Sequence, residues 1–438
     1  MNKFICCPQE LIPDEIENGV EYFSLYSSVK PRQEGVGHIA LQLQRDVRKA
    51  GVIPSVQSWD FTTIALSVAA ADDACPRSRS ADGWTRQIEM IIYLHEPSIW
   101  QAQRKNIEST LRFLTGDFWK FTFVSGGIAP PKPSRKQVKT YEADCVSLLS
   151  GGVDSLVGAI DLTAEGKHPL FVSKIVTGDK DIQKKIAKKL GATDRYFQWS
   201  FNSRSSNESE SSTRGRSIIF FAFAALAASA LKSNIRGTVP IYVPENGFIS
   251  LNVALNPSRM GSLSTKTTHP VYIDGLQKLW DAVGIDAQLI FPHDYQFKTK
   301  GELLEGCLDR QTLKDLISDS TSCGKYGRHK KTHCGRCIPC LVRRASFLKS
   351  GLTDTTSIST AYQRQYVFMN LATALSEKSS IDIRAAAGAY LRYKEQGINR
   401  FIGGSLSFAA PSERSKYEGV VARGLEEIGQ LLIQHGVI

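Results

Sequence analysis

The sequence lacks an uncharged apolar stretch long enough to cross a bilayer. The longest one, Ser217–Leu231, lies between Arg216 and Lys232 and falls short of the roughly 20 residues that a membrane-spanning helix needs. It predicts a helix buried inside a globular domain. The opening residues, MNKFICCPQE, also lack the apolar core of a secretory signal, so we expect a cytoplasmic protein with no membrane partner.

Internal repeats are absent as well, and the cysteines do not suggest a disulfide framework. A cytoplasmic chain keeps its thiols reduced, so nine cysteines point to metal binding or to buried thiols. The composition, with 42% hydrophobic and 22% charged residues, is typical of a folded globular protein. A length of 438 residues predicts two or three domains.

Acidic residues are fewer than basic ones, which gives a formal net charge of +11 and an isoelectric point near 9.1. This excess of positive charge suits a partner that carries negative charge. ATP, an RNA and an acidic protein all fit that description. Charge alone does not choose among them.

Composition divides the chain into four parts. Residues 1–128 mix strand-like and helical patterns and predict an N-terminal α+β domain. Residues 129–141 lie in a stretch rich in Gly, Pro and Lys, which predicts a linker. Residues 142–350 alternate strands, turns and helices, which predicts an α/β domain with a parallel sheet covered by helices on both faces. Within that domain the serine-rich segment Ser200–Thr213 predicts a mobile loop, and residues 351–438 predict a helical C-terminal extension.

The most informative segment begins with the apolar strand after Asp144 and continues as Ser150-Gly-Gly-Val-Asp-Ser155, directly before a helical pattern. Two glycines let the backbone approach a ligand closely, and the turn aims free amide groups at one point. The N-terminus of the following helix adds a partial positive charge. Serine hydroxyls donate further hydrogen bonds, and Asp154 can hold Mg²⁺ against phosphates. The segment therefore predicts a phosphate-binding loop that is neither the Walker loop nor the dinucleotide fingerprint.

This loop resembles that of the PP-loop ATP pyrophosphatases, which carry Ser-Gly-Gly-x-Asp-Ser after their first strand. The resemblance implies a PP-loop fold and cleavage of ATP between its α and β phosphates, with AMP passed to an acceptor oxygen. It assigns pyrophosphate binding to Ser150, Gly151, Gly152, Val153 and Ser155, and Mg²⁺ binding to Asp154.

Such a transfer relies on positioning and on stabilising charge, so cations should surround the loop. The candidates are Arg216, with Arg214 beside it, and Lys300, with Lys298 beside it. We expect Arg216 and Lys300 to act with Asp154 in catalysis.

Four cysteines have the spacing of a metal site. Cys323 is followed by Cys334, Cys337 and Cys340, which matches a Cys₄ zinc centre. An iron–sulfur cluster uses similar ligands, but one closely spaced set favours zinc. With all four positions filled by protein, the metal would be structural, and it would hold Arg343 and the basic loop at 325–331 near the active site. His333 is an alternative ligand.

The two motifs together resemble the 7-cyano-7-deazaguanine synthase (QueC) family over about residues 142–350: the glycine loop is followed by Thr321-Ser-Cys and by Cys334-Gly-Arg-Cys-Ile-Pro-Cys-Leu-Val-Arg343. Enzymes of that family adenylate the carboxylate of 7-carboxy-7-deazaguanine and convert it to an amide and then to a nitrile. Glu245, Asn246 and His269 are candidate substrate contacts, although polar loop residues at a strand end often only cap backbone groups.

This chain departs from the housekeeping enzymes by its long N-terminal part and its C-terminal extension. It also carries Phe171–Gly178 in place of their Tyr-Gly-Gln motif, and different residues at 244–269. The N-terminal part, with Asp60, Asp72 and Trp84-Thr-Arg86, is similar to the QueC-like components of Qat anti-phage systems. That similarity implies partner proteins from a defence operon, one of which could offer an amine as acceptor.

Two other functions remain open from the sequence. A PP-loop enzyme that modifies a tRNA base fits the charge and the cysteines, although no RNA-binding module is recognisable. A non-catalytic nucleotide-binding scaffold in a defence complex fits equally, although the loop retains Asp154 and both serines.

Overall fold

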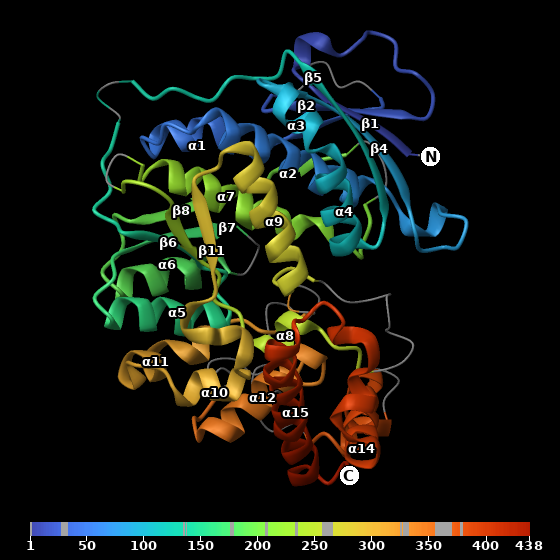
Figure 1. Ribbon diagram of the computed structural model, residues 1–438, viewed down its shortest axis with the longest axis vertical. Helices are drawn as coiled ribbons and strands as arrows, with labels where there is room; N and C mark the ends of the chain where they lie inside the picture. The colour runs from blue at the N-terminus through green and yellow to red at the C-terminus, as the bar shows by residue number, and fades with distance from the viewer. Residues whose placement is uncertain are drawn as a thin grey trace.

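The computed structural model describes residues 2–27, 34–134, 136, 138–175, 179–205, 209–232, 235–255, 266–324, 326, 333–354, 370–376 and 380–438. It is a mixed α/β protein with two sheets and a helical layer at the C-terminal end (Figure 1). In the part of the chain that it describes, no helix has both the length and the apolar character to span a membrane.

The first sheet has six strands in the order β5-β4-β1-β2-β3-β9. Their bounds are β1 Asn2–Cys7, β2 Val20–Leu25, β3 Val36–Ile39, β4 Gln87–Leu94, β5 Phe118–Ser125 and β9 Ser203–Arg204. The strands from β1 to β5 pair in parallel. Helices lie between β3 and β4 and between β4 and β5, which suits parallel pairing. The expected N-terminal α+β domain stays a prediction.

The short strand β9 pairs antiparallel with β3, His38 opposite Arg204 and Ile39 opposite Ser203. It comes from the serine-rich segment that was expected to be a mobile loop. The described residues of that segment are held in place by two kinds of contact. The Ser205 hydroxyl donates to Glu21 in the first sheet, and the backbone amide of Glu210 donates to the carbonyl of Asp73 in the helix Val56–Ala74.

The second sheet has five parallel strands in the order β11-β10-β6-β7-β8. Their bounds are β6 Cys145–Leu148, β7 Pro169–Lys174, β8 Tyr196–Trp199, β10 Val239–Tyr242 and β11 Ala287–Ile290. From β6 the chain first adds β7 and β8 on one side, and then β10 and β11 on the other. The carboxyl ends of β6 and β10 thus meet where the strand order reverses, which is where open parallel sheets bind their ligands.

Helices cover both sheets. Among the described residues they are α1 Leu43–Lys49, α2 Val56–Ala74, α3 Pro97–Ala102, α4 Arg104–Thr115, α5 Val153–Ala164, α6 Lys180–Lys189, α7 Ile218–Ser229, α8 Gly247–Leu251, α9 Pro270–Val283, α10 Lys300–Glu305, α11 Arg310–Leu316, α12 Ile338–Ser350, α14 Ile381–Ile402 and α15 Pro411–Gln434. The strands and helices expected around the glycine loop are present.

Two helices that are buried on nearly all sides, α2 and α7, pack against each other between the sheets (Figure 1). This arrangement confirms the buried helix expected at Ser217–Leu231. One apolar core runs from Phe4 to Ala287 and contains residues from both sheets. The core therefore does not divide at the linker, and the N-terminal part is packed firmly on the second sheet. The domain boundaries read from composition stay a prediction.

A second apolar core joins α8, α12, α14 and α15. It ties the C-terminal extension to the helix that follows the cysteine cluster and to the helix after β10. The extension thus lies against the segments that surround the glycine loop, below the second sheet in Figure 1.

Candidate functional site

The glycine loop lies between the end of β6 and the start of α5. Gly151 has a φ of +89°, which favours glycine, and a side chain at Gly152 would approach Ser150 Oγ and the carbonyl of Thr321 at 3.3 and 3.4 Å. Ser150 Oγ lies 3.0 Å from Ser155 Oγ and accepts from the amide of Gly152 at 3.2 Å. The N-cap residue of α5 is Gly152, which has no side chain to cap the helix. The hydroxyls and the first amide groups of the helix therefore gather around one point, as phosphate binding requires.

Asp154, in the first turn of α5, is held between two groups from distant segments. Lys300 Nζ donates to its Oδ1 at 2.5 Å, and Asn246 Nδ2 donates to its Oδ2 at 2.7 Å. Asp154 and Lys300 are both buried. Burial would raise the pKa of Asp154, but the charge of Lys300 and these hydrogen bonds hold that pKa below its usual value. The carboxylate is therefore ionised and ready to bind a cation.

A second carboxyl group lies beside Asp154. Glu245 follows β10 and precedes Asn246, which caps α8 by accepting from the amide of Ile249. Burial and the neighbouring negative charge of Asp154 raise the pKa of Glu245 well above its usual value. Glu245 therefore keeps its proton while Asp154 is ionised. Mg²⁺ prefers oxygen ligands, so the carboxylate of Asp154 fits this metal, and Glu245 would fit it after losing its proton.

Lys300 is held in place by the cap of its own helix and by the C-terminal extension. Thr299 caps α10 and forms a reciprocal capping box with Glu302. The Thr299 hydroxyl also donates to the carboxyl group of Glu427, in the buried face of α15. Helix α15, more than a hundred residues later in the chain, therefore helps to position Lys300 through its contact with Thr299.

The Glu427 contact predicts a pH-dependent stability. Burial raises the pKa of Glu427 from 4.5 to about 7, so between these values the folded protein binds a proton that the unfolded chain has released. Stability from this group is full below about pH 4.5 and is lost as the pH rises to about 7. The loss should be about 3 kcal/mol, since a tenfold change in proton affinity is worth 1.36 kcal/mol.

We expect Glu427→Gln to lack this loss, because the amide stays neutral and its oxygen still accepts from Thr299. Urea denaturation at pH 5 and pH 7.5 would measure it. Glu426→Gln is the matched control, since Glu426 forms a surface pair with Lys394. An equal fall in stability for wild type and Glu427→Gln between these pH values would show that Glu427 does not cause the pH dependence.

The segment before the cysteines supports the loop from the other side. The amide of Thr321 donates to the carbonyl of Gly151 at 3.0 Å, and the Thr321 hydroxyl donates to Asp179 at 2.9 Å. Arg343 is fully buried and donates to Ser320, to the carbonyl of Ile317 and to Asp354. The guanidinium of Arg343 is thus engaged in fixing this segment.

The four cysteines come together as the spacing predicts. Their Sγ atoms all lie within 4.8 Å of one another, with 3.9 Å from Cys323 to Cys337 and 3.9 Å from Cys334 to Cys340. A tetrahedral zinc site with Zn–S bonds of about 2.3 Å has sulfur–sulfur distances of about 3.8 Å. The amides of Cys334 and Cys337 donate to neighbouring sulfurs at 3.4 Å each. The geometry fits a metal such as zinc.

Among the described residues the cluster of ligand atoms does not include His333, whose Nε2 accepts from the amide of Ser322 at 3.1 Å. The basic loop expected beside it lies outside the described residues, except for Tyr326. Residues 256–265 of the altered segment at 244–269 lie outside them as well. His269 caps α9 and packs between Phe113 and Phe408, so its proposed contact with substrate is not supported.

Sequence reasoning missed Lys174 at the end of β7. It is 8% exposed, and its Nζ lies 5.6 Å from the ring centroid of Phe201 and 6.0 Å from that of Phe220. Burial and the positive charge of Arg216 lower its pKa to about 8. Arg216 is exposed at the start of α7, so the two cations lie near each other at the carboxyl edge of the second sheet. A lysine inside the apolar strand Phe171-Val-Ser-Lys174 was the signal available in the sequence.

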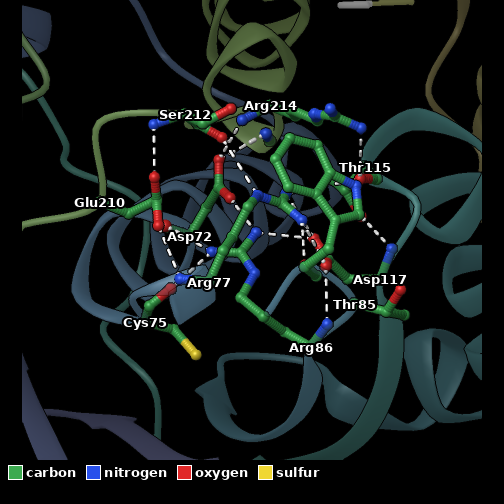
Figure 2. A network of polar contacts seen from close by, with 12 residues as sticks. Asp72, Cys75, Arg77, Thr85, Arg86, Thr115, Asp117, Glu210, Ser212 and Arg214 are labelled. Atoms are coloured by element: carbon green, nitrogen blue, oxygen red, sulfur yellow. Dashed lines mark hydrogen bonds and ion pairs between the residues drawn. The ribbon is translucent and has the colours of Figure 1, made fainter. Parts of the chain in front are cut away.

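The other two predicted cations lie elsewhere. Lys298 is only partly buried, and its Nζ is 5.7 Å from the ring centroid of Tyr295. Arg214 belongs to a buried charge network with residues of the N-terminal part, including Asp72 (Figure 2). Its guanidinium lies over the ring of Trp84, and its backbone amide donates to Asp72 at 2.6 Å. Asp72 also accepts from the amide of Gly215 at 2.6 Å. The network thereby fixes the segment that leads into Arg216 and α7.

Asp117 is the centre of this network. It accepts from Arg77 at 2.9 Å and from Arg86 at 2.6 Å, and all three side chains are almost completely buried. Burial opposes ionisation of Asp117, but its bonds to Arg86 outweigh burial and lower its pKa. Arg86 reaches Asp72 as well, so two of the residues that carry the N-terminal resemblance form one structural unit.

We expect Asp117→Asn to destabilise the protein by about 3–5 kcal/mol, because it leaves buried guanidinium groups without their counter-charge. The midpoint of urea unfolding would measure this. Glu89→Gln breaks the exposed pair with Lys120 and should cost less than about 1 kcal/mol. Equal effects of the two changes would show that the network is not a stabilising unit.

A scan against models of known protein families finds no match to the chain, and a search of solved structures finds none either.

Proposed function

We propose that the protein is an ATP pyrophosphatase-type enzyme that adenylates a carboxylate. The observation that carries the proposal is the convergence of the Ser150–Ser155 loop, Lys300 and Asn246 on Asp154, where the strand order of the second sheet reverses. This position is the usual ligand site of such sheets. The resemblance to 7-cyano-7-deazaguanine synthases supports a PP-loop fold and a 7-deazaguanine carboxylate as substrate.

In the proposed reaction, a carboxylate oxygen of the substrate attacks the α-phosphorus of ATP and forms a new C–O–P bond. The bond from that phosphorus to the bridging oxygen breaks, and pyrophosphate leaves with the electron pair. The products are the acyl adenylate and pyrophosphate. No proton is gained or lost in this step, so the protein acts by positioning and by stabilising charge.

The residues of the loop have separate roles in this proposal. The hydroxyls of Ser150 and Ser155 and the first amides of α5 hold the departing pyrophosphate. Asp154, with Glu245 beside it, would hold Mg²⁺, which neutralises phosphate charge when bound. Lys300, already 2.5 Å from Asp154, stabilises negative charge on the leaving oxygens.

The acyl adenylate would then react with an amine. Ammonia gives an amide, and a second activation gives the nitrile. An amine of a partner protein, within an anti-phage defence system, gives a conjugate instead. In either case nitrogen attacks the activated carbonyl, AMP leaves, and the nitrogen releases a proton. The enzyme would be a carbon–nitrogen ligase.

The test is exchange of labelled pyrophosphate into ATP, with and without 7-carboxy-7-deazaguanine. Exchange reports reversible adenylation and needs no acceptor amine. We expect exchange that requires the carboxylate. ATP binding by calorimetry without any exchange would support a scaffold instead, and exchange that depends on added tRNA would support a base-modifying enzyme.

A further inference from the structure

Lys174 holds a buried positive charge with no hydrogen-bond or ion-pair partner for its Nζ among the described residues. Its contacts are the rings of Phe201 and Phe220, at 5.6 and 6.0 Å, the outer limit of cation–π attraction. Such distant contacts do not offset the removal of an ammonium group from water. A buried cation of this kind is explained by an anion that binds beside it.

The position of Lys174 relative to the glycine loop is fixed by strand register. Val172 pairs with Leu148, so Lys174 at the end of β7 lies level with Ser150, two residues beyond the end of β6. The amide group of Gln183 donates to the carbonyls of both residues, at 3.0 Å to Ser150 and 3.3 Å to Lys174. The lysine is thus a direct neighbour of the proposed pyrophosphate site.

Side-chain alternation places the lysine on the α7 face of the sheet. Leu170 and Val172 belong to the core that contains α7, whereas Phe171 belongs to the core on the α5 side. Alternate side chains of a strand lie on the same face, so Lys174 lies on the face of Leu170 and Val172. Arg216, just before α7, acts electrostatically on Lys174, and the N-terminus of α7 adds a partial positive charge at this edge. Three sources of positive potential therefore surround one position beside the loop.

We propose that Lys174 binds an oxyanion at the reacting centre, on the α7 side of the loop, with Arg216 and the start of α7 adding positive potential. The inference rests on the proposed adenylation. The loop holds the pyrophosphate half of ATP, so the neighbouring oxyanion is either the α-phosphate or the carboxylate of the substrate. In both cases the protonated amine donates hydrogen bonds to oxygens whose negative charge is redistributed in the transition state.

The experiment uses the full-length protein and Lys174→Met, which keeps the length of the side chain and removes its charge. Lys180→Met, at the exposed start of α6, is the matched control. Pyrophosphate exchange, thermal unfolding, and the affinities for AMP and for 7-carboxy-7-deazaguanine are measured for each. AMP probes the α-phosphate, and the deazaguanine probes the carboxylate.

We expect Lys174→Met to lower exchange by about 100-fold or more, as loss of a single oxyanion donor does. Its affinity for one of the two probes should fall at least tenfold, and that probe identifies the anion. Its melting temperature should equal or exceed that of wild type, because a buried charge without a partner has been removed. Lys180→Met should match wild type in every measurement.

Two outcomes overturn the inference while leaving the proposed function intact. One is exchange and probe affinities in Lys174→Met within twofold of an active wild type. The other is a loss of activity that simply follows a fall in melting temperature, which would make Lys174 a structural residue. A wild type that neither exchanges pyrophosphate nor binds either probe overturns the proposed function and this inference together.

Discussion

Asp154→Asn is expected to lower the rate of pyrophosphate exchange by about 1,000-fold. The change removes the carboxylate that would hold Mg²⁺ against the phosphates. Stabilisation of transition-state charge by a bound metal is worth several kcal/mol, and each 1.36 kcal/mol corresponds to a factor of ten in rate. Exchange with labelled pyrophosphate and 7-carboxy-7-deazaguanine measures the loss directly.

The substitution should leave the fold intact. Lys300 would lose its partner at 2.5 Å, but Glu245 lies beside Asp154, and its proton is retained mainly because of burial and the charge of Asp154. With that charge gone, Glu245 can ionise and pair with Lys300. We therefore expect folded protein, reduced magnesium dependence and weak residual ATP binding through the loop.

Asp181→Asn, at an exposed position in the first turn of α6, controls for the general effect of losing a negative charge. It should exchange pyrophosphate at the wild-type rate. An Asp154→Asn protein that retains more than a tenth of wild-type exchange would refute the metal-binding role of Asp154.

The second large effect concerns the four cysteines. Cys340→Ser is expected to abolish metal binding and to unfold the segment from Thr321 to Cys340, because structural zinc contributes about 10–16 kcal/mol to the folding of small zinc domains. Since the amide of Thr321 supports Gly151, ATP binding should weaken as well. Metal analysis by mass spectrometry, together with thermal unfolding, would follow both effects.

The matched control is Cys307→Ser, because Cys307 is buried but lies outside the cluster. We expect one zinc per chain in wild type and in Cys307→Ser, and none in Cys340→Ser. Stoichiometric iron together with visible absorbance in the wild type would show that the cysteines hold an iron–sulfur cluster instead of zinc. Protein that is fully stable after complete metal removal would contradict a structural metal.

Short-range patterns were predictable from the sequence because one local geometry satisfies them. The glycine loop needs only a strand, a turn and a helix in succession, and the structure has β6, the loop and α5 in that order. The metal site needs four thiols at close spacing, and their sulfurs converge. The buried helix α7 follows from an apolar segment with no polar face.

Long-range arrangements were not predictable in the same way. Parallel pairing in the N-terminal sheet was missed, because parallel and antiparallel strands carry similar local patterns and differ in how distant segments cross. Ser200–Thr213 has the composition of a mobile loop, but its composition does not reveal that Asp73 and Glu21 offer partners. Arg343 follows a motif of the proposed family, yet burial commits it to the segment from Ile317 to Ser320.

The sequence by itself determined which groups are at hand: a glycine-rich loop with one carboxylate, and four thiols that can hold a metal. Only the tertiary structure decided which groups surround that carboxylate. Lys300 lies 146 residues from Asp154 and Asn246 lies 92 residues from it, while Glu427 reaches Thr299 across 128 residues. Such contacts depend on how helices and strands pack into one core, and packing is a property of the whole chain. The conformation of a loop and the spacing of metal ligands, in contrast, are fixed by residues that are close in sequence.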